Sequence, residues 1–395
     1  MKKVCVLLNG GIASDSRVIR EIKTMANVAD VDLYYVDGKD SDKDIFGDNV
    51  RLFSCEKKED LKSKFVKHTC FYNEFMFFVP EVLKQGVAYD YIWANDLPNL
   101  KPALKLKKKL GSKVIYDSHE IFVGTLNQFF PSKAKWYKSI LYKTAFFVMS
   151  TLGNRAEKKM VKRADKFVTT SISFKNYFKN KYKRNDIQIV MNCPNIQTAN
   201  DFYDFRSEYN LSSDSFVLLF QGRLNAGRAL IEMIESMAYV KSNIHLFVIG
   251  DGTLKKDMQK RTVELSLQEK VHFIDEVPSS ELLSYTRGAD AGINLQASIN
   301  ISKHLASANK LFEYTHSGIP TIGSDVPENR LIIEKYDLGM LVRNNPKEIA
   351  DVINKMSESD LSKYKANCKK ASMEYNWENQ EKVILDLIEE NITCV

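Results

Sequence analysis

Two loops of this 395-residue sequence place ionisable side chains where strands are expected to end. Asp96 follows an apolar run at Tyr91–Ala94, and His119 and Glu120 follow the run Lys113–Asp117. Ionisable groups at the carboxyl end of a buried strand are costly unless they are used. We therefore identify Asp96, His119 and Glu120 as catalytic candidates. A helix cap is the alternative for Asp96, and a structural role is the alternative for His119.

The segment 221–228 (QGRLNAGR) follows another apolar run and opens a predicted helix. Arg223 and Arg228 on this glycine-containing loop are suited to bind a diphosphate through charge-assisted hydrogen bonds. The alternative is that both are ordinary surface arginines. The turn at Gly250 and Asp251 closes the next predicted strand, and we include it in the same predicted binding site.

Two further groups have residue types suited to an anion. In the segment Asn309–Tyr314, Lys310 and Glu313 lie three residues apart and so share one helical face. The lysine can meet a phosphate while the carboxylate accepts from a ribose diol; an exposed surface pair is the alternative. Gly10 and Gly11 follow the first predicted strand and permit close approach of the backbone to an anion. The GxGxxG fingerprint is absent, and a tight turn before a capped helix explains these glycines equally well.

The elements that would position these residues alternate along the chain. Short β-branched runs recur at Val4–Leu8, Val31–Val36, Tyr91–Ala94, Lys113–Asp117, Lys166–Ser171, Ile187–Met191, Phe216–Gln221, Ile244–Ile249, Val271–Ile274, Ala291–Leu295, Pro320–Gly323 and Met340–Val342. Helical patterns lie between many of them, which predicts parallel sheets covered by helices on both faces. The expected fold is α/β, with two doubly wound domains. A polar stretch suggests domains at 1–195 and 196–375, followed by a last helix in 376–395 that packs back towards the first domain.

The charge is divided between the two predicted domains. The net charge is +7, but the first 195 residues are basic and the remainder is acidic. Within Lys133–Lys162, lysines interleave with aromatic and apolar residues, a pattern typical of a helix that lies on an anionic membrane surface. A solvated lysine-rich surface is the alternative. The acidic second half and the lack of known RNA- or DNA-binding signatures argue against nucleic acid.

Cysteine usage and hydropathy bound the class of protein. The six cysteines are scattered, without paired spacing or histidine partners, which excludes an obvious zinc module or disulfide framework. No signal peptide is recognisable, and no run reaches the roughly 18 apolar residues of a membrane span. We expect a cytoplasmic protein that is peripheral on the inner face of the cell membrane.

Four segments resemble the GT4 family of retaining glycosyltransferases, which have the GT-B fold, with two Rossmann-like doubly wound domains facing a cleft. They are DSRVIRE near the start, ANDLPNLKPALKLKKKLGSKVIYDSHE in the first half, and FQGRLNAGRAL and NKLFEYTHSGIPTIGSD in the second. The resemblance covers nearly the whole chain. It implies that the first domain holds an acceptor and the second a nucleotide-sugar, for which a UDP-sugar is favoured.

The resemblance also implies roles for individual residues. His119 matches the family's active-site histidine, and Arg223 matches the arginine of its GR element. Arg228 stands where the family usually has a lysine, and Glu313 matches the second glutamate of its two-glutamate motif, which binds ribose. The first glutamate would lie at Leu305, where this sequence differs. The resemblance further implies that backbone groups of Asn309, Lys310 and Leu311 contact the phosphates, to which Lys310 can add its ammonium, and that Gly10 and Gly11 approach the donor.

The implied reaction moves a sugar from a nucleotide diphosphate to a glycan or lipid-linked acceptor with retention of configuration. It needs no metal and no other cofactor, since cations of the chain can stabilise the leaving diphosphate. The implied setting is bacterial surface polysaccharide or glycolipid synthesis. The alternatives are a sugar-nucleotide epimerase of the same fold, or a basic membrane-surface binding protein without catalysis.

Overall fold

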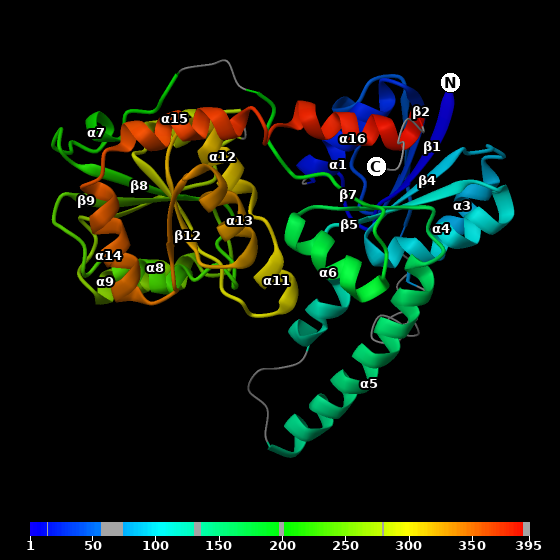
Figure 1. The fold of residues 1–395 in the computed structure, drawn as a ribbon, viewed down its shortest axis with the longest axis horizontal. Helices are drawn as coiled ribbons and strands as arrows, with labels where there is room; N and C mark the ends of the chain where they lie inside the picture. Colours follow the sequence, from blue (N-terminus) through cyan, green and yellow to red (C-terminus); the bar gives the residue numbers. More distant parts are fainter. Residues whose placement is uncertain (14, 57–73, 130–135, 197–200, 279, 390–395) are drawn as a thin grey trace. The chain divides into compact units, whose positions relative to one another are not determined.

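The computed structural model describes residues 1–13, 15–56, 74–129, 136–196, 201–278 and 280–389. These residues divide into two compact units, shown in Figure 1. The first unit comprises Met1–Met191 together with the chain from Gln380 onward, and the second comprises Asn192–Asn379. The borders predicted at 195 and 375 fall close to these two transitions.

The first unit is built on a parallel sheet with the strand order β3-β2-β1-β4-β5-β6-β7. Its strands are β1 (Lys2–Leu7), β2 (Ala29–Tyr35), β3 (Val50–Ser54), β4 (Tyr91–Asn95), β5 (Lys113–Ser118), β6 (Lys166–Thr169) and β7 (Ile187–Ile189). The strand order reverses between β1 and β4, which pair in parallel. Every residue of β4 is buried, as expected for a strand covered on both faces.

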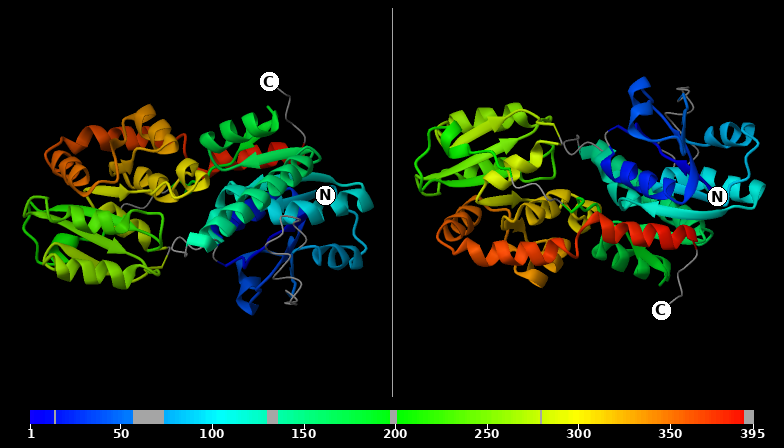
Figure 2. Two further views of the ribbon diagram at one scale, coloured as in Figure 1. Left: turned by 90° about the horizontal axis from the view of Figure 1, so that it is seen from below. Right: turned by 90° about the horizontal axis from the view of Figure 1, so that it is seen from above.

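The helices of the first unit follow from this order. They are α1 (Ser16–Ala26), η1 (Asp40–Ile45), α3 (Phe78–Lys84), α4 (Asp96–Leu110), η2 (Phe122–Phe129), α5 (Trp136–Val161), α6 (Ile172–Tyr182) and the last helix, α16 (Trp377–Glu389). Helix α1 joins β1 to β2 and helix α4 joins β4 to β5, so the two connections run in opposite directions along the sheet. Right-handed connections therefore place the two helices on opposite faces of the sheet. Figure 2 shows helices on both faces of the sheets.

The last helix lies with the first unit. Thr24 on α1 donates to the Glu381 carboxylate at 3.0 Å, and the backbone N–H of Met191 donates to the Gln380 side chain at 2.8 Å. The chain therefore returns to the first unit after it has completed the second.

The second unit has a six-stranded parallel sheet with the order β10-β9-β8-β11-β12-β13. Its strands are β8 (Phe216–Gln221), β9 (Ile244–Ile249), β10 (Val271–Ile274), β11 (Ala291–Asn294), β12 (Thr321–Ser324) and β13 (Gly339–Val342). Its helices are α7 (Phe205–Glu208), α8 (Leu230–Ser236), α9 (Lys255–Glu264), α10 (Leu282–Gly288), α11 (Ile301–Leu305), α12 (Asn309–Ser317), α13 (Pro327–Tyr336), α14 (Pro346–Ser357) and α15 (Leu361–Ser372).

Both sheets reverse their strand order at a central pair, β1/β4 in the first unit and β8/β11 in the second. In open parallel sheets, ligands bind outside the carboxyl ends of the strands at such a switch point. The residues at the ends of β4, β5, β8 and β11 are therefore the ones to examine. No helix in the part of the chain that the structure covers is long and apolar enough to cross a membrane.

Candidate functional site

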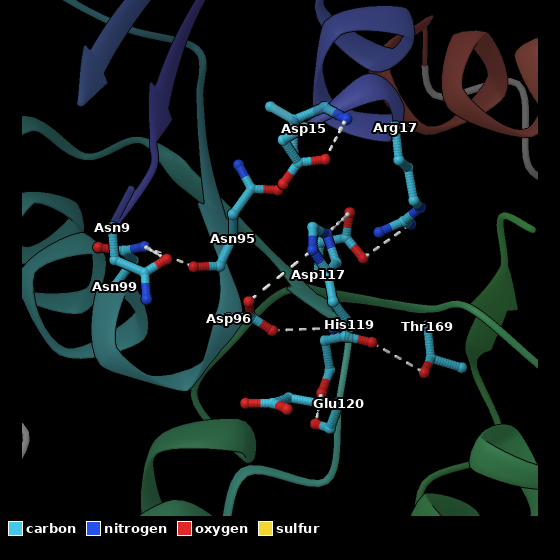
Figure 3. A network of polar contacts seen from close by, with 12 residues as sticks. Asn9, Asp15, Arg17, Asn95, Asp96, Asn99, Asp117, His119, Glu120 and Thr169 are labelled. Atoms are coloured by element: carbon cyan, nitrogen blue, oxygen red, sulfur yellow. Dashed lines mark hydrogen bonds and ion pairs between the residues drawn. The ribbon is translucent and has the colours of Figure 1, made fainter. Parts of the chain in front are cut away.

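His119 lies at the centre of a buried polar network in the first unit (Figure 3). Its backbone N–H donates to the Asp96 carboxylate at 2.9 Å. Its ring nitrogens lie 3.8 Å from Asp96 and 3.3 Å from Asp117. Because β4 and β5 are neighbours, the residues that follow them bring Asp96 and His119 together.

Side chains from β4 and from α1 donate hydrogen bonds to Asp117. The indole N–H of Trp93 on β4 donates to it at 3.3 Å, and Arg17 on α1 donates to it at 3.0 Å. The same guanidinium nitrogen lies 2.8 Å from Glu21. No role was assigned to Arg17 or Glu21 from the sequence. Arg17 and Glu21 lie four residues apart on the helix after the first strand, and this spacing of opposite charges is the sequence feature that could have identified them.

The charges in this network determine which groups hold protons. Burial and the charge of Arg17 oppose protonation of His119, but Asp96 and Asp117 outweigh both and raise its pKa to about 9. Burial alone would raise the pKa of Asp117, yet Arg17 and His119 hold it well below its usual range. Burial raises the pKa of Glu21 well above its usual value, against the opposing effect of Arg17. His119 is therefore a charged hydrogen-bond donor at neutral pH rather than a base.

Asp96 does not serve as a helix cap. Asn95 is the N-cap of α4 and makes no side-chain cap bond, and the Asp96 carboxylate is directed to His119 instead. Asp96 also has a φ of 62°, a conformation that costs a residue with a Cβ roughly 1–2 kcal/mol. Strain of this kind persists where the surroundings hold a side chain in a required place. The capping interpretation of Asp96 is therefore wrong.

The other predicted residues of the first unit have weaker links to His119. Glu120 joins the network through its backbone, since its carbonyl accepts from Ser118 at 2.9 Å. Neither Gly10 nor Gly11 has a positive φ. A Cβ at Gly10 would meet no atom within 4 Å, so packing within the first unit does not require glycine there.

The Glu21, Asp117 and His119 side chains offer ligand atoms within 4.8 Å of one another, a spacing that could hold a metal ion. Arg17 already bridges the two carboxylates of this group. Its fixed charge would oppose a cation at the same place. The residues present therefore fit an internal ion-pair network better than a metal site.

In the second unit, three cations gather around the end of β8. Arg228 makes no hydrogen bond or ion pair to any residue that the structure describes, and burial and the charge of Arg223 lower its pKa. The Lys310 ammonium is buried and has no hydrogen-bond partner within the described chain. Arg223 is exposed and has only a 3.5 Å contact with Glu276. Among the residues that the structure describes, Arg228 and Lys310 thus form no ion pair with a carboxylate.

Glu313 is held beside these cations by a short chain of hydrogen bonds. The amide of Gln221, at the end of β8, donates to the Glu313 carboxylate at 2.6 Å. Thr286 on α10 donates to the other end of that amide at 2.8 Å. Gln221 is buried, and it positions Glu313, a function that was not predicted from the sequence.

The loops around the cations depend on glycine. Gly250 has a φ of 138°, and a Cβ there would lie 2.2 Å from the carbonyl oxygen of Gly222. This close packing fixes the loop after β8 against the loop after β9, and it accounts for Gly250 without a ligand. Asp251 is exposed, and its carbonyl accepts from the backbone N–H of Leu224 at 2.8 Å.

The predicted backbone contacts lie at the start of α12. Asn309, Lys310 and Leu311 form its first turn, and the N-cap residue Ala308 supplies no side-chain hydrogen bond. The start of a helix left uncapped in this way favours a negatively charged group. Leu305, which stands in place of the family's first glutamate, is the last residue of α11.

Comparison with known proteins assigns the second unit. Residues 201–375 match the sequence profile described as glycosyl transferases group 1. The second unit is a group 1 glycosyl transferase domain. A curated relative is the lipopolysaccharide core biosynthesis glycosyltransferase LpsD of Rhizobium meliloti, which is 26% identical over 141 residues. That match covers 36% of this chain and spans only 38% of the relative's length.

Solved structures similar to the whole chain show its fold. HepE of Anabaena, solved in complex with UDP, is 16% identical with a TM-score of 0.74, covering 99% of this chain and 100% of that one. Sucrose-phosphate synthase from Thermosynechococcus elongatus is also 16% identical, with a TM-score of 0.73 and 99% of each chain covered. These likenesses confirm the predicted fold class, an α/β fold with two doubly wound parallel sheets of the GT-B type.

The charge state of His119 can be measured by NMR titration of the imidazole. We expect His119 to stay protonated until about pH 9, whereas burial lowers the pKa of His272 in the second unit to about 4. Because the folded-state pKa of His119 lies above its ordinary 6.5, this charge stabilises the fold fully below pH 6.5 and ceases to do so as pH rises through 9.

The Asp96→Asn change should lower the pKa of His119 by about one unit, since it removes one of the two carboxylates that favour the charged ring. Asp44→Asn, at an exposed position of the first unit, is the matched control and should leave both histidines unchanged. A His119 that titrates near 6.5, or that does not respond to Asp96→Asn, would contradict this description of the network.

Proposed function

We propose that this protein is a retaining glycosyltransferase that takes a sugar from a nucleotide diphosphate, with a UDP-sugar as the favoured donor. The observation that carries the proposal is the pair of cations, Arg228 and Lys310, that have no acceptor among the described residues of the second unit. A buried cation without a counter-ion is unfavourable. A bound diphosphate removes that cost.

The donor would be held by charge and by one carboxylate. Arg223 and Arg228 bind the diphosphate through charge-assisted hydrogen bonds, together with backbone N–H groups at the start of α12. Glu313, held by Gln221, accepts from the ribose hydroxyls. Support comes from HepE of Anabaena, whose structures include complexes with UDP and with UDP-glucose.

The chemistry follows from the charges that develop. As the bond between the anomeric carbon and the diphosphate breaks, negative charge grows on the leaving group, and the two arginines stabilise it. The acceptor hydroxyl bonds to the anomeric carbon on the face that the leaving group vacates, and its proton passes to the departing phosphate oxygen. The configuration is thereby retained, as the family resemblance implies. His119, as a charged donor, binds a hydroxyl of the transferred sugar.

The acceptor is proposed to be a glycan or a lipid-linked saccharide of bacterial surface polysaccharide or glycolipid synthesis. The relative LpsD is named for lipopolysaccharide core biosynthesis, which supports this class of acceptor. An epimerase would interconvert the nucleotide-sugar by itself. A transferase would only hydrolyse it slowly until an acceptor is supplied, so analysis of the products separates the two.

Lys133 and Lys135 of the predicted basic segment lie outside the described residues, whereas α5 is described.

We also propose that α5 attaches the first unit to an anionic membrane surface. Within α5, Phe147 is 69% exposed, and Val148 and Leu152 are exposed beside it. Lys143, Arg155, Lys158 and Lys159 are exposed on the same helix. In Figure 1 this helix runs away from the sheet of the first unit. Exposed apolar side chains among cations are the pattern of an interfacial helix.

The donor site can be tested by thermal shift and calorimetry with UDP-, GDP- and ADP-glucose. A nucleotide-sugar that binds should raise the melting temperature by mass action. Arg228→Met should weaken its binding about 10- to 100-fold, the cost of a lost hydrogen bond between charged groups. Arg343→Met, at an exposed position of the same unit, is the matched control and should bind normally. Unchanged binding in a protein with both Arg223→Met and Arg228→Met would contradict the proposed site.

Membrane attachment can be tested by flotation with vesicles of phosphatidylcholine, with and without phosphatidylglycerol. We expect binding only to the anionic vesicles and loss of binding as salt screens the charges. Phe147→Ser and Lys143→Glu should each reduce it several-fold. Met373→Ser removes a comparably exposed apolar side chain from the second unit and should have no effect. Flotation that is insensitive to salt and to both α5 changes would exclude α5 as the attachment site.

A further inference from the structure

Lys310 is a lysine whose amine has been removed from water without an acceptor. Only 5% of the residue is exposed, and Nζ lies 3.6 Å from the centre of the Phe220 ring on β8. No described oxygen accepts a hydrogen bond from it. The ring face favours a cation, but it replaces little of the hydration that an ammonium loses.

The charged groups around Lys310 act on it in opposite directions. Burial lowers the pKa of Lys310 well below its usual value, and the positive charge of Arg228 lowers it further. Glu313, one helical turn along α12, has the opposite effect, but its carboxylate is already engaged by Gln221. Arg223 adds positive charge next to Arg228. Without a ligand, burial and the charge of Arg228 therefore favour loss of the Lys310 proton relative to an exposed lysine.

A diphosphate bound at the arginines changes this balance. It carries two negative charges and would compensate Arg223 and Arg228, the groups whose positive charge opposes an ammonium nearby. This effect acts through space, so Lys310 need not leave the Phe220 ring.

We propose that the diphosphate of the donor binds together with one proton, which Lys310 takes up as an ammonium. The inference rests on the proposed function, because it requires a diphosphate at Arg223 and Arg228. In this step the amine lone pair accepts a proton from solvent, no other bond forms or breaks, and the site gains one positive charge. The ammonium is then already in place when the leaving diphosphate acquires its further negative charge, and the proton returns to solvent when the nucleotide is released.

The sign of the resulting pH dependence is fixed by linkage. Because binding takes up a proton, affinity for the donor rises as the pH falls, by up to about tenfold per pH unit. The dependence ends at low pH, where Lys310 is already charged in the free protein. A permanently charged lysine would give no such dependence between about pH 6 and pH 9.

Calorimetry of the whole chain can count the proton. The probe is UDP-glucose, or whichever nucleotide-glucose of the panel binds most tightly. Its diphosphate is esterified at both ends and does not titrate in this range. Binding enthalpies measured in phosphate and in Tris buffer, which differ in ionisation enthalpy, give the number of protons taken up. For the unmodified protein we expect uptake that approaches about one proton per site within this range.

Two variants assign the proton. Lys310→Met keeps the length and apolar character of the side chain and should bind the probe with no proton uptake. Lys303→Met, an exposed position on α11, is the matched control and should keep the uptake of the unmodified protein. Melting curves check that both variants are folded.

Two results would overturn the inference while leaving the donor site intact. One is tight binding by the unmodified protein with no proton uptake anywhere between about pH 6 and pH 9, a result that needs no variant. The other is the same uptake in Lys310→Met as in the unmodified protein. If none of the nucleotide-glucoses binds at all, the proposed function itself fails and the inference fails with it. That outcome is distinguished by the absence of any binding heat.

Discussion

Positive charge that the described residues leave unpaired is the constraint on which the second unit depends. Arg228 and Lys310 lie near one another without acceptors in the described residues, and the Glu313 carboxylate beside them accepts a hydrogen bond from Gln221. The close backbone approach of Gly250 to Gly222 holds the loop that carries the arginines. The uncompensated positive charge reduces stability in the absence of a ligand. The group 1 domain therefore holds cations that lack a paired anion among the described residues.

In the first unit, by contrast, the buried charged groups are paired with one another. Its carboxylates and cations are matched inside the chain: Arg17 spans Glu21 and Asp117, while Asp96 and Asp117 flank His119. The result is a histidine that keeps its proton at neutral pH and is fixed in orientation, partly through a strained backbone at Asp96. The first unit thus holds one oriented, charged hydrogen-bond donor.

The sequence predicted the fold well because buried parallel strands leave a clear apolar signal and because switch-point loops are defined by strand order. It missed β3, an edge strand with no continuous apolar run. His119 and Asp96 meet because their strands are neighbours. The contact of Arg17 with Asp117 joins residues 100 apart in the chain, and the bond between Gln221 and Glu313 depends on how α12 packs. No local pattern encodes such contacts. The assigned catalytic and donor-binding roles stay predictions.

A crystal structure of the chain with UDP bound would test the central claim most directly. We expect the diphosphate within hydrogen-bonding distance of Arg223 and Arg228, at the start of α12, with the ribose hydroxyls on Glu313. It would be contradicted by a nucleotide seated elsewhere while Arg228 and Lys310 remain without an anion, or by protein carboxylates that pair with these two cations in the free chain.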